Sequence, residues 1–310
     1  MNSASAPGKI ILFGEHAVVY GQPALAVPVT QVRATVEVSP SDYRGVWIEA
    51  PDIRLKAELD ELEPDQPLAS IIPNLLYSLG ADPFPNIDIR ISSTIPVASG
   101  LGSGAAVSVA LIRALSSYLG RTVSNEEVND LAFELEKIYH GTPSGIDNTV
   151  VTYAKPVYFQ RGQPIGTFKP RKPFTIVIGD TGIPAPTKQS VADLRKLWEK
   201  DRSLWEGIFT QVGRIVNEAR HAIEYGKIKE LGELMDRNED LLQHMTVSSP
   251  ELERLVEAAR DAGALGAKLS GGGRGGNMIA LAGASESSRN AIRECLLEAG
   301  ARRVITTTIG

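Results

Sequence analysis

The sequence contains a single cysteine, Cys295, so neither a disulfide nor a thiolate metal site can form within one chain. It has no apolar run long enough to cross a bilayer. The segment before Lys9 lacks the apolar core of a signal peptide. Basic residues are not in excess, and the formal net charge of −5 argues against general affinity for nucleic acid. These absences predict a cytoplasmic protein with no nucleic acid and no membrane among its partners.

Size and composition indicate two domains. The chain has 310 residues, which is more than a single hydrophobic core usually serves. Hydrophobic residues make up 43% of the chain, enough for two cores, and no internal repeat or low-complexity segment is present. We place the domain boundary so that the N-terminal domain covers residues 1–165 and the C-terminal domain covers residues 166–310.

Periodicity predicts the elements. Apolar and polar residues suggest strands over 10–13, 18–20, 25–29, 32–38, 87–91, 174–179, 277–281 and 303–307. Helices are expected over 68–79, 105–119, 124–139, 188–199, 204–225, 227–242, 250–262 and 286–299, with a capping box at Ser124 and Glu127. Residues 150–153 and 157–159 suggest a hairpin, and residues 51–66 an acidic surface excursion. The order in the second half indicates an α+β layer.

Glycine is abundant, and the segment between residues 96 and 106 has it at three alternate positions: Gly100, Gly102 and Gly104. Each glycine costs about 1 kcal/mol relative to alanine inside a helix, so propensity does not explain this spacing. A glycine loop at a helix N-terminus presents free N–H groups to an anion, and Ser103 is the candidate N-cap. A tight strand-to-helix turn explains the loop alone equally well. Neither the GxxxxGK(S/T) loop nor a good dinucleotide fingerprint is present.

Polar residues beside glycine- or proline-rich turns are the candidates for chemistry: Lys9, Glu15 with His16, Glu136, and Ser144 with Asp147. Most have a structural explanation when taken singly, such as a solvated turn or helix face. The Glu15–His16 pair is harder to dismiss, because burying either group unpaired inside an apolar strand is costly. Taken together, a phosphate-binding loop, a carboxylate for Mg²⁺, and a second carboxylate with a lysine suggest phosphoryl transfer.

Three motifs carry a family resemblance: APGKIILFGEHAVVYG at residues 6–21, PVASGLGSGAA at 96–106 and KLSGGGRGG at 268–276. With them the chain resembles the GHMP kinases. The stretches EHAVVYG at 15–21 and HGTPSGIDNTV at 140–150 are similar to the branch that phosphorylates mevalonate, and Asp180-Thr-Gly182 agrees. The resemblance implies an α+β, two-domain fold: a ribosomal protein S5 domain 2-like N-terminal domain and a ferredoxin-like C-terminal domain with extra helices.

The resemblance also implies a reaction, the transfer of the γ-phosphate of ATP to the 5-hydroxyl of (R)-mevalonate, which enters isoprenoid synthesis. By position, Asp147 would be the catalytic base with Lys9 beside it, and Glu136 would be the Mg²⁺ ligand. The site would lie between the two domains of the chain, and the protein would be a homodimer. Mevalonate would be bound by Glu15, His16, Ser144 and Thr181. The ATP phosphates would be bound by Pro96, Ser99, Gly100, Leu101, Gly102, Ser103, Gly104, Ala105, Ala106 and Gly273.

Two positions depart from the family pattern. Gly104 replaces a serine whose hydroxyl usually binds Mg²⁺, and Arg274 replaces a glycine. Arg274 could contact phosphate, but we expect a solvated side chain. The alternatives are a GHMP kinase acting on phosphomevalonate or a sugar, and a non-catalytic ligand sensor on the same fold. The stretch 15–20 offers no basic cluster for a phosphorylated acceptor, and the presence of Lys9, Glu136 and Asp147 together argues against a sensor.

Overall fold

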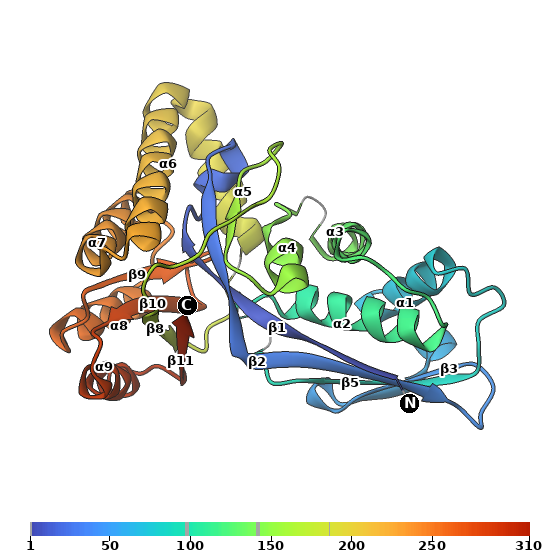
Figure 1. Ribbon diagram of the computed structural model, residues 1–310. Helices are drawn as coiled ribbons and strands as arrows, with labels where there is room; N and C mark the ends of the chain where they lie inside the picture. Colours follow the sequence, from blue (N-terminus) through green and yellow to red (C-terminus); the bar gives the residue numbers. More distant parts are fainter. Residues whose placement is uncertain (1, 97–98, 141–142, 186) are drawn as a thin grey trace. The chain divides into compact units, whose positions relative to one another are not determined.

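The computed structural model describes residues 2–96, 99–140, 143–185 and 187–310 (Figure 1). The chain forms two compact units that alternate along the sequence. The first unit contains Met1–Gly8, Val32–Pro96 and Gly102–Ala154, and the second contains Lys9–Gln31, Val97–Leu101 and Lys155–Gly310. Strands β1 (Asn2–Phe13) and β2 (Ala24–Pro40) therefore each contribute residues to both units.

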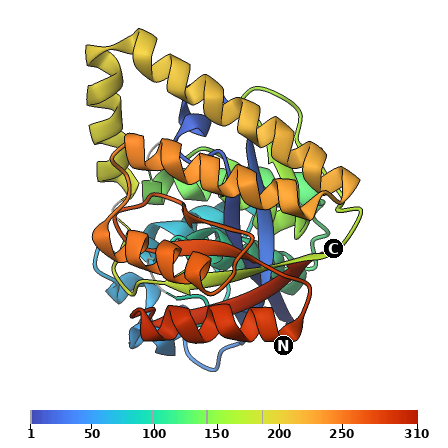
Figure 2. The ribbon, with the colours of Figure 1, turned by 90° about the vertical axis from the view of Figure 1, so that its left-hand side faces the viewer.

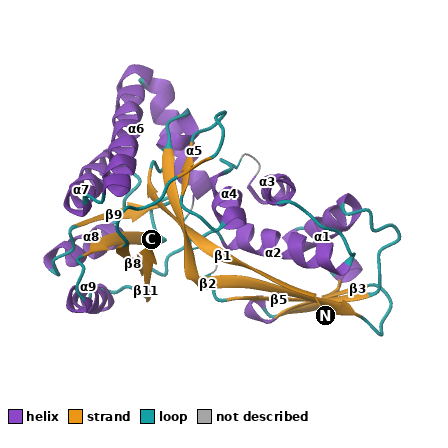
Figure 3. Ribbon diagram, in the orientation of Figure 1, coloured by secondary structure: helices purple, strands orange, loops and turns teal. Residues whose placement is uncertain are grey.

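The first unit is a sheet covered by helices. Its strands follow the order β4 (Leu55–Glu58), β3 (Val46–Ala50), β5 (Ile87–Ser93) and β2, and only β3 and β5 among these neighbours are parallel. Along β5 the isoleucines at 87, 89 and 91 are buried while the residues between them are exposed. The helices lie along one side of the sheet in Figure 3: α1 (Pro67–Ser78), α2 (Ser103–Tyr118), α3 (Asn125–His140) and α4 (Ile146–Tyr153).

The second unit is built on an antiparallel sheet in the order β11 (Arg303–Ile309), β8 (Phe174–Asp180), β10 (Asn277–Ala282) and β9 (Gly266–Ser270). Every residue of β8, β9 and β10 is buried, so these strands are covered on both faces. Helix α8 (Pro250–Asp261) packs on β9 and β10, and α9 (Glu286–Glu298) packs on β8 and β11.

The other helices of the second unit pack against one another. Helices α6 (Arg202–Tyr225) and α7 (Ile228–His244) lie side by side in Figure 2, and α5 (Thr187–Lys200) contacts α6. The short strand β6 (Val157–Phe159) pairs with the beginning of β2, and β7 (Gly166–Thr167) pairs with β6. No helix among the described residues combines the length and the apolar character needed to cross a bilayer.

Helix α7 approaches β9 closely at two glycines. A Cβ atom on Gly232 would overlap the backbone carbonyl of Leu265, and one on Gly266 would overlap the carbonyl of Gly232. No side chain fits at either position without moving the backbone. The glycine pair therefore sets how closely the helix packs against the sheet edge.

The predicted helices are all present, with ends within a few residues of those expected. The capping box is confirmed, because the Ser124 N–H donates to Glu127 Oε2 at 2.7 Å and the Glu127 N–H donates to Ser124 Oγ at 3.2 Å. The mixed α+β architecture is confirmed as well.

Several predicted strands were wrong. Residues 18–20 belong to the 3₁₀ helix η1 (Ala17–Tyr20), because left-handed residues before it turn the chain out of β1. Residues 150–153 end helix α4 instead of forming a hairpin, since a short buried apolar run has no diagnostic period. The two strands expected over 25–38 are one, β2. Strand β9 was not predicted, because its apolar and polar residues do not alternate. The predicted surface excursion over 51–66 contains η2 (Pro51–Ile53), β4 and η3 (Leu59–Glu61).

Candidate active site

In the first unit, the glycine loop leads directly into α2. Gly102 has φ 72°, a left-handed conformation that glycine adopts at little cost. The helix begins at Ser103, and Ala106 donates the first helical hydrogen bond, to the Gly102 carbonyl at 2.9 Å. The N–H groups of residues 103–105 precede that bond and are directed out of the helix end. Ser103 was predicted as the N-cap, but Gly102 occupies that position and no side chain caps the helix.

Glu136 lies on α3 with its carboxylate close to the first turn of α2. The residue is 4% exposed, and a Cβ atom on Gly104 would be 3.4 Å from Glu136 Oε1. Gly104 is not among the positive-φ glycines of the described chain, so serine would meet no backbone strain there. The described residues contain no group of three His, Cys, Asp or Glu side chains that could bind a metal alone. A single carboxylate beside a phosphate loop instead fits Mg²⁺, which takes its other ligands from substrate and water.

Asp147 lies in the first turn of α4, where the helix dipole favours an acidic side chain. Gly145, with φ 91°, is the N-cap, and the Ser144 hydroxyl accepts the Ile146 N–H at 3.3 Å. Residues Val97, Ala98, Gly141 and Thr142 of the sequence motifs lie outside the described residues.

In the second unit, Glu15 and His16 form the turn that follows β1. They were predicted inside a strand, but His16 has φ 59° and η1 begins at the next residue. Lys9, on β1, is 4% exposed, and its backbone N–H donates to the Leu101 carbonyl at 2.9 Å. Burial raises the pKa of the Glu15 carboxyl, and the charge of Lys9 offsets part of this rise. The first motif, at residues 6–21, thus places Lys9, Glu15 and His16 in the same unit.

Sequence reasoning missed the buried partner of Glu15. Lys268 Nζ donates to Glu15 Oε1 at 2.5 Å, and neither side chain is exposed. Burial raises the pKa of Glu15, and Lys268 opposes this rise. Glu239 is also buried, its Oε2 accepts the Leu269 N–H at 2.7 Å, and burial raises its pKa. A lysine between Ala267 and Leu269 in an apolar strand was the signal, because a buried ammonium needs a counter-charge.

His16 presents one ring nitrogen as a buried acceptor. Its Nε2 lies 3.1 Å from the Gly272 carbonyl, which can only accept, so Nε2 carries the proton. Burial lowers the pKa of His16 to about 4, and the ring is therefore neutral at pH 7. Nδ1 is then unprotonated, and it is buried with no hydrogen-bond partner among the described residues. A ligand hydroxyl could donate to it.

Thr181, Gly273 and Ser99 belong to the loops around this turn. The Thr181 hydroxyl donates to the Gly276 carbonyl at 2.9 Å. Gly273 has φ 68°, and a Cβ atom there would overlap the Val247 carbonyl. The Ser99 carbonyl accepts from Asn277 Nδ2 at 2.5 Å, which joins the segment before Gly100 to β10.

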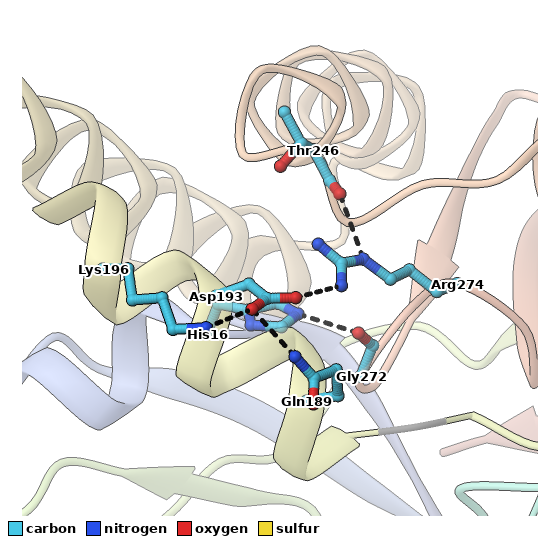
Figure 4. Close-up of polar contacts among 7 residues, drawn as sticks. All are labelled: His16, Gln189, Asp193, Lys196, Thr246, Gly272 and Arg274. Atoms are coloured by element: carbon cyan, nitrogen blue, oxygen red, sulfur yellow. Dashed lines mark hydrogen bonds and ion pairs between the residues drawn. The ribbon is translucent and has the colours of Figure 1, made fainter.

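Arg274 does not have the solvated side chain that was expected. Its Nη1 pairs with Asp193 Oδ2 at 2.7 Å, and both side chains are 29% exposed (Figure 4).

The units divide the predicted site residues. Glu136, Ser144, Asp147, Pro96 and residues 102–106 lie in the first unit. Lys9, Glu15, His16, Thr181, Gly273 and residues 99–101 lie in the second. Within the first unit the structure brings Glu136 to the start of α2, and within the second it brings His16 to the loop that contains Gly273.

Comparisons with known proteins agree along almost the whole chain. The family described as "GHMP kinases N terminal domain" matches residues 69–155, and "GHMP kinases C terminal" matches residues 219–302. Mevalonate kinase of Pyrococcus horikoshii is 40% identical over 300 residues, covering 90% of this chain and 88% of the relative. Mevalonate kinase of Thermococcus sibiricus is 39% identical over 304 residues, covering 92% and 90%.

Solved structures have the same fold. The crystal structure of L. major mevalonate kinase in complex with R-mevalonate aligns with a TM-score of 0.87 and 32% identity, covering 100% of this chain and 96% of that one. Streptococcus pneumoniae phosphomevalonate kinase, in complex with phosphomevalonate and AMPPNP, has a TM-score of 0.83 at 20% identity, covering 99% and 100%. The latter likeness concerns the fold alone.

Proposed function

The chain belongs to the GHMP kinases, and from this premise we propose that it transfers the γ-phosphate of ATP to the 5-hydroxyl of (R)-mevalonate. The observation that carries the acceptor assignment is the buried turn at Glu15 and His16, which offers an acceptor atom to an alcohol. The relatives named mevalonate kinase support the same substrate.

Asp147 and Lys9 are the proposed catalytic residues. Asp147 would accept the proton of the 5-hydroxyl as it attacks the γ-phosphorus, and Lys9 would stabilise the charge on the reacting oxygen. Phosphoryl transfer depends mainly on positioning and charge neutralisation, which these two groups would supply for the acceptor.

ATP and Mg²⁺ are assigned to the loop and helix end of the first unit. The N–H groups at the start of α2 would bind phosphate oxygens. Glu136 would hold Mg²⁺, and the Ser103 hydroxyl is the other side-chain oxygen at this helix end, because Gly104 supplies none. A bound Mg²⁺ supplies positive charge to the phosphates during transfer.

The mevalonate pocket would use Glu15, His16, Ser144 and Thr181. The neutral His16 ring would accept a hydrogen bond at Nδ1 from a substrate hydroxyl. Thr181 already donates its hydroxyl proton to Gly276, so it could only accept a further hydrogen bond. Ser144 accepts from Ile146 and retains its own proton to donate.

The alternatives remain a kinase for phosphomevalonate or a sugar, and a ligand sensor. A phosphorylated acceptor needs cations, whereas Lys268 is committed to Glu15 and His16 is neutral. A homodimeric state, a cytoplasmic location and the domain boundary after residue 165 stay predictions.

A coupled ADP-release assay with mevalonate, phosphomevalonate and galactose tests the proposal. Mevalonate is expected to be the preferred acceptor. Asp147→Asn should lower kcat by about 10²–10⁴-fold while ATP binding is retained, because the carboxylate acts on the acceptor. Asp130→Asn, an exposed carboxylate on α3, is the control and should behave as wild type. Faster turnover of another acceptor would overturn the substrate, and near wild-type kcat in Asp147→Asn would overturn the base.

A further inference from the structure

Three segments of the second unit, among them the loop between β9 and β10, each contain a residue in an uncommon backbone conformation. Arg274 has φ 57°, and Thr246 and His16 have φ 58° and 59°. These left-handed non-glycine residues belong to the cluster drawn in Figure 4. Such conformations are costly and persist only where the surrounding contacts hold them, so the contacts of this cluster need a reason.

Arg274 joins three segments of the second unit. Its Nη1 donates to Asp193 Oδ2 on α5 at 2.7 Å, and its Nε lies 3.4 Å from the Thr246 carbonyl after α7. Its backbone N–H donates to the Val247 carbonyl at 2.8 Å. The loop is thereby fastened to α5 and to the end of α7.

Asp193 is held for this contact. Its Oδ1 accepts from Gln189 Nε2 at 2.8 Å and from Lys196 Nζ at 3.1 Å, which orients the carboxylate from both sides along α5. The hydrogen bond from Arg274 is the largest of the causes that hold the pKa of Asp193 well below its ordinary value. The carboxylate therefore stays ionised at neutral pH, so both partners of the ion pair carry their charges there.

The same loop fixes the His16 ring. Gly272, two residues before Arg274, provides the carbonyl that accepts from His16 Nε2. Thr187, at the start of α5, lies so close to Gly272 that a Cβ atom there would overlap its hydroxyl. Helix α5 thus contacts the loop at Gly272 through Thr187 and at Arg274 through Asp193.

We propose that Arg274 is a positioning residue for acceptor recognition, which fastens the β9–β10 loop to α5 through Asp193 and so holds the Gly272 carbonyl against His16. The inference rests on the proposed function, because that function assigns His16 to the acceptor alcohol. It explains why arginine stands where the family resemblance leads one to expect glycine. Loss of the ion pair loosens the attachment of the loop to α5 and lets the ring leave the orientation in which Nδ1 can accept a hydrogen bond from the substrate.

Steady-state kinetics test the proposal with Asp193→Asn and Arg274→Gln. Each should raise KM for mevalonate about tenfold with KM for ATP and kcat within about twofold, the signature of lost acceptor positioning. The double variant should be no worse than either single variant, since both remove the same contact. Glu199→Gln is the control, because it breaks an ion pair of 3.3 Å with Arg195 on the same helix but away from the loop.

Two further variants separate positioning from folding. Arg274→Gly suits the left-handed backbone, so it should keep its melting temperature while showing the same rise in KM for mevalonate. Arg274→Lys retains the charge without the planar fork and should recover part of the affinity. An unchanged KM for mevalonate in Asp193→Asn, or an equal rise in the KM values of both substrates, overturns the proposal.

Nitrogen-15 NMR of the His16 ring, recorded without substrate, is independent of the reaction. Wild type should show a proton on Nε2, and Asp193→Asn should show exchange between tautomers, because the Gly272 carbonyl no longer selects one of them. If wild type fails to phosphorylate mevalonate, the proposed function is wrong. An unaltered ring spectrum in Asp193→Asn would instead refute the positioning role of Arg274.

Discussion

At the scale of single residues, His16 shows how the fold selects a chemical state. A histidine in water is divided between charged and neutral forms near pH 6.5, and in either neutral tautomer both ring nitrogens can bond to solvent. In the turn after β1, burial excludes the charged form and the Gly272 carbonyl selects the tautomer protonated on Nε2. The ring becomes a fixed acceptor, which an alcohol substrate can use and a carbonyl cannot.

The burial of neutral His16 should appear as a pH-dependent stability. Its pKa is about 4 in the folded protein and 6.5 as the unperturbed value, so between these values only the unfolded chain binds the proton. This contribution is complete above pH 6.5 and is lost as the pH falls, and the loss amounts to about 3 kcal/mol by pH 4. Chemical denaturation of wild type and His16→Gln over this range should show that the wild-type-minus-variant difference in unfolding free energy falls by about this amount as the pH is lowered.

The comparison with His16→Gln is needed because Glu15 and Glu239 have raised pKa values and act in the opposite sense. Glutamine can still donate to the Gly272 carbonyl but does not titrate. A wild-type-minus-variant difference that stays constant from pH 7 to pH 4 would show that His16 is not buried in its neutral form.

At the scale of elements, the contact between α7 and β9 is decided by two missing side chains. Most helix glycines weaken a helix, because alanine is favoured there by about 1 kcal/mol. Gly232 is different, since its Cβ position is taken by the backbone of Leu265. Strand β9 carries Lys268, so the fit of α7 against the strand also affects where the buried ammonium lies.

Gly232→Ala and Gly207→Ala should change stability in opposite directions. In Gly232→Ala the overlap with backbone should cost at least about 2 kcal/mol, because neither segment can move without repacking. Gly207 lies exposed in α6 with nothing within 4 Å of its Cβ position, so Gly207→Ala should stabilise by about 0.5–1 kcal/mol. Urea denaturation measures both. Similar gains in the two variants would mean that α7 does not approach β9 this closely.

At the scale of the whole molecule, residues near the two ends of the chain form one interior. Lys268 pairs with Glu15, and the Ser270 hydroxyl donates to the Ile11 carbonyl at 2.7 Å. The end of β1 is thereby joined to β9 within the second unit, across most of the sequence. The remaining oxygen of Glu15 has no hydrogen-bond partner among the described residues, so the pair depends heavily on Lys268.

Breaking the pair from one side should be more damaging than removing both charges. Lys268→Met leaves a carboxyl group buried without its partner and should cost about 3–5 kcal/mol, whereas Glu15→Gln combined with Lys268→Met should recover part of this loss. Lys227→Met, which breaks an exposed ion pair of 3.0 Å with Glu230, should change stability by less than about 1 kcal/mol. Urea denaturation gives all three values, and additive losses at positions 15 and 268 would contradict the coupling.

The sequence by itself determined the helices other than α4 and the α+β class, because these depend on local periodicity and capping. Ser124 and Glu127 cap α3 as their spacing requires. The motifs likewise identified Asp147, Glu136 and the Glu15–His16 turn as candidates, and the comparisons confirmed the family.

Only the tertiary structure decided which residues meet. Lys268 and Glu15, or Arg274 and Asp193, are distant in sequence, and nothing in their local pattern selects one partner over another. Residues 150–153 were predicted as a strand, but they belong to helix α4. A short buried apolar run is compatible with either element, so tertiary packing decides between them. The tautomer of His16 follows from the same cause, because the Gly272 carbonyl reaches it only through a loop near the other end of the chain.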